Sequence, residues 1–148
     1  MTSSLIEPKT ILIQNRNEIE FTTKIRGALS FGVVSPSQTS DVIVVKLRVE
    51  NSTRIGNIQI ALVDTGGIDF TTTRFGISSS PYYNANTVPT AYFQGVNSEL
   101  YSGNENNVSV DNQNRTESNF VYLNVKYPND MQFTSGVVRY KWFFDYVG

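Results

Sequence analysis

The segment Gly136–Val147, with the sequence GVVRYKWFFDYV, alternates between two kinds of side chain. One set is charged or small and includes Arg139, Lys141 and Asp145. The other set is apolar or aromatic and consists of Val138, Tyr140, Trp142, Phe144 and Tyr146. A two-residue period predicts a β-strand with one buried face. Because a buried Trp or Phe removes roughly 150–250 Å² from water, we expect this strand to anchor the core from a central position.

Five further segments show the same period. Asp41–Glu50 and Asn57–Val63 are predicted to form one antiparallel hairpin, and Lys9–Gln14 and Glu18–Ile25 another. Phe120–Lys126 alternates as well. The chain contains 27 Val and Ile residues, whose branched side chains favour strands over helices. The sequence therefore predicts an all-β protein, a single antiparallel β-sandwich of immunoglobulin-like or jelly-roll-like topology with six to nine strands.

A chain of 148 residues has the usual length of one domain, so residues 1–148 are expected to form a single sandwich. Two parts are expected to extend from it. The polar segment Met1–Lys9 is predicted to be an arm that pairs with a neighbouring molecule. Residues 78–118 are poor in aliphatic side chains and form one long loop excursion, with short strands around Ala91–Gly95 and Asn107–Val110.

The composition excludes several classes of chemistry. The chain has no Cys and no His, which rules out thiol nucleophiles, disulfides, Ser-His-Asp triads and zinc sites built from these residues. Only 17% of the residues are charged, the net charge is −1, and the basic residues are scattered, so no nucleic acid partner is expected. No apolar run is long enough to span a membrane, and the N-terminus has no signal-peptide pattern. We expect no cofactor, no metal and no membrane insertion.

The segment Ala61–Gly67, ALVDTGG, is the sharpest catalytic motif. It resembles the Asp-Thr-Gly signature of retropepsin-like aspartic proteases, in which two carboxylates share a proton. That resemblance implies a homodimer with Asp64 as the catalytic aspartate, held by Thr65 and Gly66. The aliphatic pair and Gly that this family places downstream are not found here. The alternative, which we favour, is a strand that ends in a turn, because these are ordinary turn residues.

Five aromatic residues of the excursion form the predicted binding site. Tyr and Asn side chains suit protein contacts, because they offer a large contact area at low entropy cost, and exposed aromatic rings also stack on sugars. A protein surface and a glycan are thus both candidate ligands. The alternative is that these rings fold inward and cover one end of the sandwich. The residues are Tyr82, Tyr83, Tyr92, Phe93 and Tyr101.

The stretch LSFGVVSP at residues 29–36, followed by VVKLRVEN at residues 44–51, resembles the opening of many immunoglobulin-like modules. This resemblance implies a β-sandwich and no particular activity. The chain lacks the Cys pair of antibody domains, so kinship with those is not supported. The whole profile, short, leaderless, free of Cys and His and rich in Asn, Ser and Thr, also resembles accessory proteins of bacteriophage particles that decorate capsids or associate with tails.

Together these features predict a non-enzymatic structural or binding protein located in a virion, with the cell surface or the extracellular space as the alternative. Its expected partners are other virion or surface proteins and copies of itself, so that it would be an oligomer. The aspartic protease subunit built on Asp64 and a carbohydrate-binding module are the alternative functions.

Overall fold

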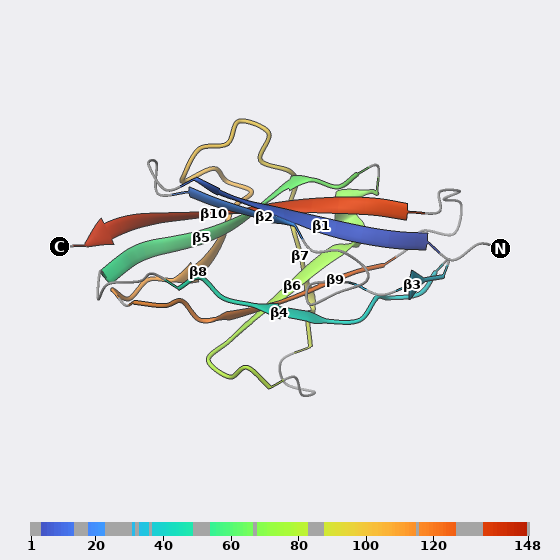
Figure 1. The fold of residues 1–148 in the computed structure, drawn as a ribbon, viewed down its shortest axis with the longest axis horizontal. Helices are drawn as coiled ribbons and strands as arrows, with labels where there is room; N and C mark the ends of the chain where they lie inside the picture. Colours follow the sequence, from blue (N-terminus) through green and yellow to red (C-terminus); the bar gives the residue numbers. More distant parts are fainter. Residues whose placement is uncertain are drawn as a thin grey trace.

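The computed structural model describes residues 4–13, 18–22, 31, 33–35, 37–48, 54–66, 68–82, 88–114, 116–126 and 135–147. These residues form ten β-strands in two sheets that pack face to face (Figure 1). The predicted all-β sandwich is confirmed. Among the described residues, no helix is long and apolar enough to cross a membrane.

The first sheet has the strand order β2-β1-β10-β5-β8, with β3 paired to β1 on the side. Its strands are β1 (Ser4–Ile13), β2 (Glu18–Thr22), β3 (Val33–Val34), β5 (Arg54–Asp64), β8 (Val108–Asp111) and β10 (Ser135–Val147). The second sheet has the order β4-β9-β6-β7. Its strands are β4 (Ile43–Val45), β6 (Thr73–Ser78), β7 (Ala91–Tyr92) and β9 (Phe120–Val125), and a short 3₁₀ turn, η2 (Phe70–Thr72), precedes β6. The count exceeds the expected six to nine, because two-residue pairings such as β3 and β7 are too short to show an alternation in the sequence.

The strand pairs are nested along the chain. β1 pairs with β10, β4 with β9, β5 with β8 and β6 with β7. This is the winding of a jelly roll, in which one long hairpin is rolled into two sheets. The described strand order thus follows the jelly-roll alternative. One pair departs from that plan, since β1 runs parallel to β10 while the other three pairs are antiparallel.

One predicted hairpin is confirmed and the other is wrong. β1 and β2 pair antiparallel, with Lys9 opposite Thr22. The hairpin predicted for Asp41–Glu50 and Asn57–Val63 does not form, because β4 and β5 lie in different sheets. Alternation fixes which face of a strand is buried, but it does not choose the neighbour that the strand pairs with.

The predicted N-terminal arm is part of the first sheet in this structure. Leu5 to Lys9 pair with Ser135 to Arg139 of the same chain. The first three residues of the predicted arm lie outside the described residues. The short strands expected inside the excursion are present as β7 and β8.

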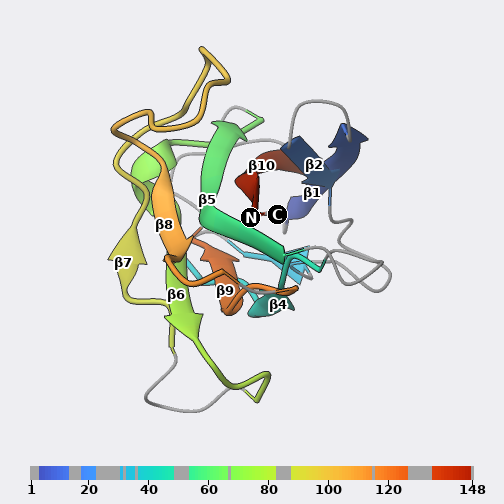
Figure 2. The same ribbon diagram turned by 90° about the vertical axis from the view of Figure 1, so that its left-hand side faces the viewer.

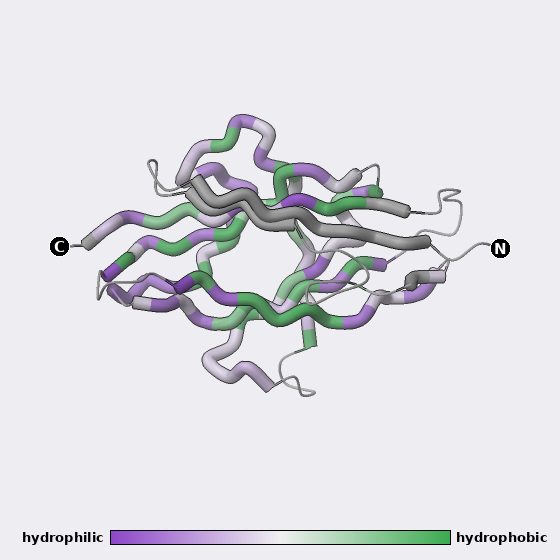
Figure 3. The backbone as a smooth tube through the Cα atoms, viewed as in Figure 1, coloured by the Kyte–Doolittle hydropathy of each residue, from purple (hydrophilic) through white to green (hydrophobic). Residues whose placement is uncertain are grey.

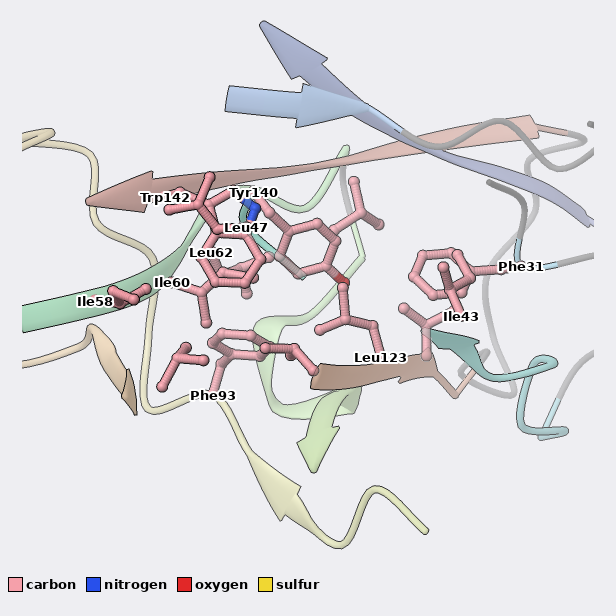
Figure 4. Packing of buried hydrophobic residues seen from close by; sticks show 14 of the residues in the cluster. Phe31, Ile43, Leu47, Ile58, Ile60, Leu62, Phe93, Leu123, Tyr140 and Trp142 are labelled. Carbon is pink, nitrogen blue, oxygen red and sulfur yellow. The ribbon is translucent and has the colours of Figure 1, made fainter. Parts of the chain in front are cut away.

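The core lies between the two sheets. Figure 4 shows Trp142 and Leu62 of the first sheet meeting Leu123 of the second and Phe93, which follows β7. Figure 3 shows that hydrophobic positions lie mainly along the strands of the two layers, whereas the loop above the first sheet is mostly hydrophilic. β10 is central, between β1 and β5, and Trp142 is 2% exposed. Both expectations for this strand are confirmed.

Replacing Trp142 with Ala is expected to lower the free energy of unfolding by about 3–5 kcal/mol, the range for deleting a buried aromatic side chain. Urea titration followed by circular dichroism measures this loss. Tyr146→Ala on the same strand is the matched control, since Tyr146 is 49% exposed. Equal losses for both variants would contradict the placement of Trp142 in the core.

Candidate functional site

The structure separates the five aromatic residues predicted to bind a partner. Tyr101 belongs to the loop between β7 and β8, which rises above the first sheet in Figure 1, whereas Tyr82 belongs to the segment after β6, which lies below the second sheet. Tyr92 lies on β7, and all three of these side chains are exposed. Tyr83 lies outside the described residues. Hence Tyr82, Tyr92 and Tyr101 do not form one continuous surface.

Phe93 is not at the surface and the prediction for it is corrected. It is 1% exposed, and its ring centroid lies 5.1 Å from that of Phe75 and 5.8 Å from that of Tyr140. Its backbone amide donates to the carbonyl oxygen of Thr73 at 3.2 Å, which prolongs the pairing of β7 with β6. Consecutive residues of an extended chain point to opposite sides, so Tyr92 faces outward and Phe93 faces the core.

The strongest candidate site is the loop of residues 94–107 between β7 and β8, which we name the Asn-braced loop. Asn97 is fully buried at its base. Its Nδ2 donates to the carbonyl oxygen of Tyr101 at 3.0 Å and to Oδ1 of Asn107 at 2.9 Å. Its Oδ1 accepts from the backbone amide of Leu100 at 3.0 Å. A fourth hydrogen bond runs from the Asn97 backbone amide to the carbonyl oxygen of Leu62 on β5, at 2.8 Å.

Gln59 holds the second half of the Asn-braced loop. Its Oε1 accepts from the backbone amide of Gly103 and from Nδ2 of Asn107, both at 3.0 Å. Ile58 and Ile60 on either side of Gln59 point into the core, so Gln59 lies on the outer face of the first sheet. The loop is therefore fastened against that outer face, where Figure 2 shows it projecting from the sandwich.

The tip of the Asn-braced loop presents Leu100 and Tyr101, both exposed. Leu100 has a φ of 56°, in the left-handed region that non-glycine residues seldom adopt. The hydrogen bond from its amide to Asn97 holds it there. Strained residues of this kind cluster at ligand contacts and switch regions. The apolar tip is thus held in a strained conformation by one buried amide side chain, that of Asn97.

The outer face of the second sheet is a separate surface. Arg74 on β6 lies opposite Asn124 on β9 and opposite Tyr92 on β7. The Arg74 guanidinium lies 5.3 Å from the centre of the Tyr92 ring, a cation–π contact at the edge of the sheet. Beside them the hydroxyl of the buried Tyr122 contacts the carbonyl oxygens of Ser80 and Tyr82, so the segment after β6 folds back under this sheet.

An ion pair marks one end of this face. Nζ of Lys46 lies 2.7 Å from Oε2 of Glu117, and it also lies 5.0 Å from the centre of the Phe120 ring. Backbone contacts set this geometry, because Ser118 donates its amide to the Leu47 carbonyl oxygen at 2.8 Å and its Oγ accepts from the Leu47 amide at 2.9 Å. The hydrogen bond and the charge of Lys46 lower the pKa of the Glu117 carboxyl.

Asp64 lies at the exposed end of β5, in a turn. Its Oδ1 accepts from the backbone amide of Gly66 at 2.8 Å. Gly66 has a φ of 63°, and a Cβ atom there would collide with the carbonyl oxygen of Val137. Because these contacts form the turn, the turn itself accounts for the Asp-Thr-Gly sequence. The protease alternative requires a second copy of Asp64 and stays a prediction.

No known protein family, curated protein or solved structure matches the chain. The resemblances of residues 29–51 and of the whole profile therefore stay predictions. The function has to be inferred from the geometry of the surface alone.

Replacing Asn97 with Ala is expected to lower the free energy of unfolding by about 1–3 kcal/mol, because the three hydrogen bonds of this buried side chain are lost. It should also raise the amide exchange rate of Leu100, which hydrogen-exchange mass spectrometry measures. The exposed Asn114→Ala is the control, with an expected change within about 0.5 kcal/mol. Unchanged exchange at Leu100 in the Asn97 variant would show that the tip is not held by this residue.

The Glu117 carboxyl has an ordinary pKa of 4.5 that Lys46 lowers in the folded protein. A lowered folded-state pKa contributes stability above the unfolded-state value, and this contribution is lost as the pH falls through the folded-state pKa. We therefore expect the stability advantage of the unaltered protein over Glu117→Gln to be constant near neutral pH and to shrink in acid below the ordinary value. Urea titrations at a series of pH values measure it. A difference that is independent of pH would contradict the pairing with Lys46.

Proposed function

We propose that this chain is a non-enzymatic structural protein that acts through protein–protein contacts, as a capsid-decorating or tail-associated component of a virus particle. The observation that carries the proposal is the apolar tip of the Asn-braced loop, where Leu100 and Tyr101 are exposed and are held by the buried side-chain amide of Asn97. We therefore place the contact on this tip alone and not on the whole excursion of residues 78–118.

Pre-organisation favours the tip as a contact. A loop that is already held in one conformation loses little entropy when it binds, so more of its contact energy appears as affinity. Its composition of Tyr, Ser, Gly and Asn is that of binding loops in which rigid aromatic residues anchor and small polar residues adapt. Large exposed side chains such as Leu100 and Tyr101 are otherwise costly to leave in water.

Two further features support a place in a virus particle. Double-sheet jelly rolls build many capsid proteins as well as lectin domains. A protein that only adheres needs no groups that titrate near neutral pH, in keeping with the absence of His and Cys. A protein ligand is favoured over a glycan, because the segments that carry Tyr82 and Tyr101 lie on opposite sides of the sandwich (Figure 1), so the two rings do not form one stacking surface. The fold alone does not decide between these uses.

The absence of Cys from the chain permits a direct test, since a single introduced Cys takes a photoreactive crosslinker without background. Tyr101→Cys places the crosslinker at the tip, and Tyr146→Cys is the matched control because Tyr101 is 51% and Tyr146 49% exposed. The labelled proteins are added to particles purified from cells that encode the chain. We expect the Tyr101 label, and not the Tyr146 label, to crosslink to one structural protein of the particle, identified by mass spectrometry.

A second variant separates contact from folding. Leu100→Asn removes the apolar side chain, while Asn tolerates the left-handed conformation at this position. We expect this variant to keep its unfolding midpoint and to lose the crosslink from position 101. Crosslinks of equal yield from positions 101 and 146, or a Leu100→Asn variant that binds particles normally, would overturn the assignment.

A further inference from the structure

The Asn-braced loop is acidic as well as apolar. The sequence has no Lys or Arg between Arg74 and Arg115, while Glu99, Glu105 and Asp111 all lie in that interval. Glu99 and Glu105 are exposed, and Glu99 directly precedes Leu100 at the tip. Within the described part of the chain neither carboxylate forms an ion pair. The apolar tip is thus bordered by two uncompensated negative charges.

The outer face of the second sheet has the opposite sign. Four basic residues lie on it or beside it, and the carboxylate bound among them is Glu117, which pairs with Lys46. In the described ranges the remaining three cations form no ion pair. Exposed aromatic side chains of β7 and the segment after β6 accompany these charges. The four basic residues are Lys46, Arg48, Arg74 and Lys126, and the aromatic residues are Tyr82 and Tyr92.

These two surfaces lie on opposite sides of the molecule. Gln59 fastens the Asn-braced loop to the outer face of the first sheet, whereas Arg74 and Tyr92 belong to the outer side of the second. Figure 2 shows the loop projecting away from β6 and β7. One copy therefore cannot bring its own two surfaces together, but two copies can.

We propose that the protein associates head to tail, with the acidic apolar tip of the Asn-braced loop of one copy seated on the basic aromatic face of the second sheet of the next copy. This inference rests on the proposed function, because it uses the same tip and names a second copy of the chain as its partner. The charges are complementary, which steers the encounter and fixes the orientation of the contact. The apolar side chains on both surfaces leave water together.

The geometry of this contact determines the form of the assembly. Two different surfaces meet, so the contact is heterologous, and each added copy leaves one tip and one face free. Association then continues until a ring closes or a filament grows. A self-complementary dimer, by contrast, would stop at two copies.

Sedimentation velocity of the full chain over a range of concentrations tests the proposal. We expect the weight-average mass to rise with concentration past that of a dimer and to fall when salt is added, because salt screens the charged contact. The tip variant Glu99→Lys with Leu100→Asn, and the face variant Tyr92→Ser with Lys126→Gln, should each lower the association constant by about tenfold or more, as loss of a central contact does. Tyr146→Ser is the matched control and should assemble like the unaltered chain.

Sedimentation of a mixture of the two variants is the decisive measurement. The tip variant retains an intact face and the face variant retains an intact tip, so an equimolar mixture can form one good contact and should yield heterodimers that grow no further. A chain that stays monomeric at all concentrations, or a mixture that forms no heterodimer, overturns head-to-tail association. If a monomeric chain still crosslinks through position 101 to a particle protein, this inference fails while the proposed function stands. If the crosslink is absent and head-to-tail assembly is observed, the particle assignment fails instead.

Discussion

Burial of the core-facing side of β10 is the constraint on which the rest of the structure depends. Tyr140, Trp142 and Phe144 fill the space between the sheets from this one strand, and burial raises the pKa of the Tyr140 phenol. Because β10 lies in the middle of its sheet, between β1 and β5, the last strand of the chain is next to the first. The strands between them must then wind inward as nested pairs, which yields the jelly-roll order.

Neutral amides explain how a chain with few charges builds a firm surface loop. Asn and Gln side chains both donate and accept, so the side chain of Asn97 satisfies two backbone groups of the loop and that of Gln59 one, without burying a charge. Some of the fifteen Asn residues thus have a structural role as hydrogen-bonding side chains. Two groups of surface charges differ in sign: carboxylates border the tip of the Asn-braced loop, and cations lie on the outer face of the second sheet. Two opposite sides of the molecule therefore carry charges of opposite sign.

Periodicity predicted the strands well because alternation is a local property of the chain. Phe120–Lys126 and Gly136–Val147 match β9 and β10, and the turn interpretation of Asp64 agrees with its contact to Gly66. Partner choice was not predictable in the same way, since Asp41–Glu50 and Asn57–Val63 show similar patterns and yet belong to different sheets. The candidate site was predicted in part: Tyr101 lies at the tip, but the role of Asn97 had no signal, because one Asn among fifteen looks like any other.

The sequence by itself determined the class of fold, the identity of the anchoring strand and the absence of Cys and His chemistry, since these follow from composition and from the two-residue period. Only the tertiary structure decided that Tyr92 faces solvent while its neighbour Phe93 joins the core, that Lys9 pairs within its own chain, and that Leu100 is displayed on a braced loop. The physical reason is that burial, register and charge separation arise between segments far apart in the chain, so they exist only once those segments have packed together.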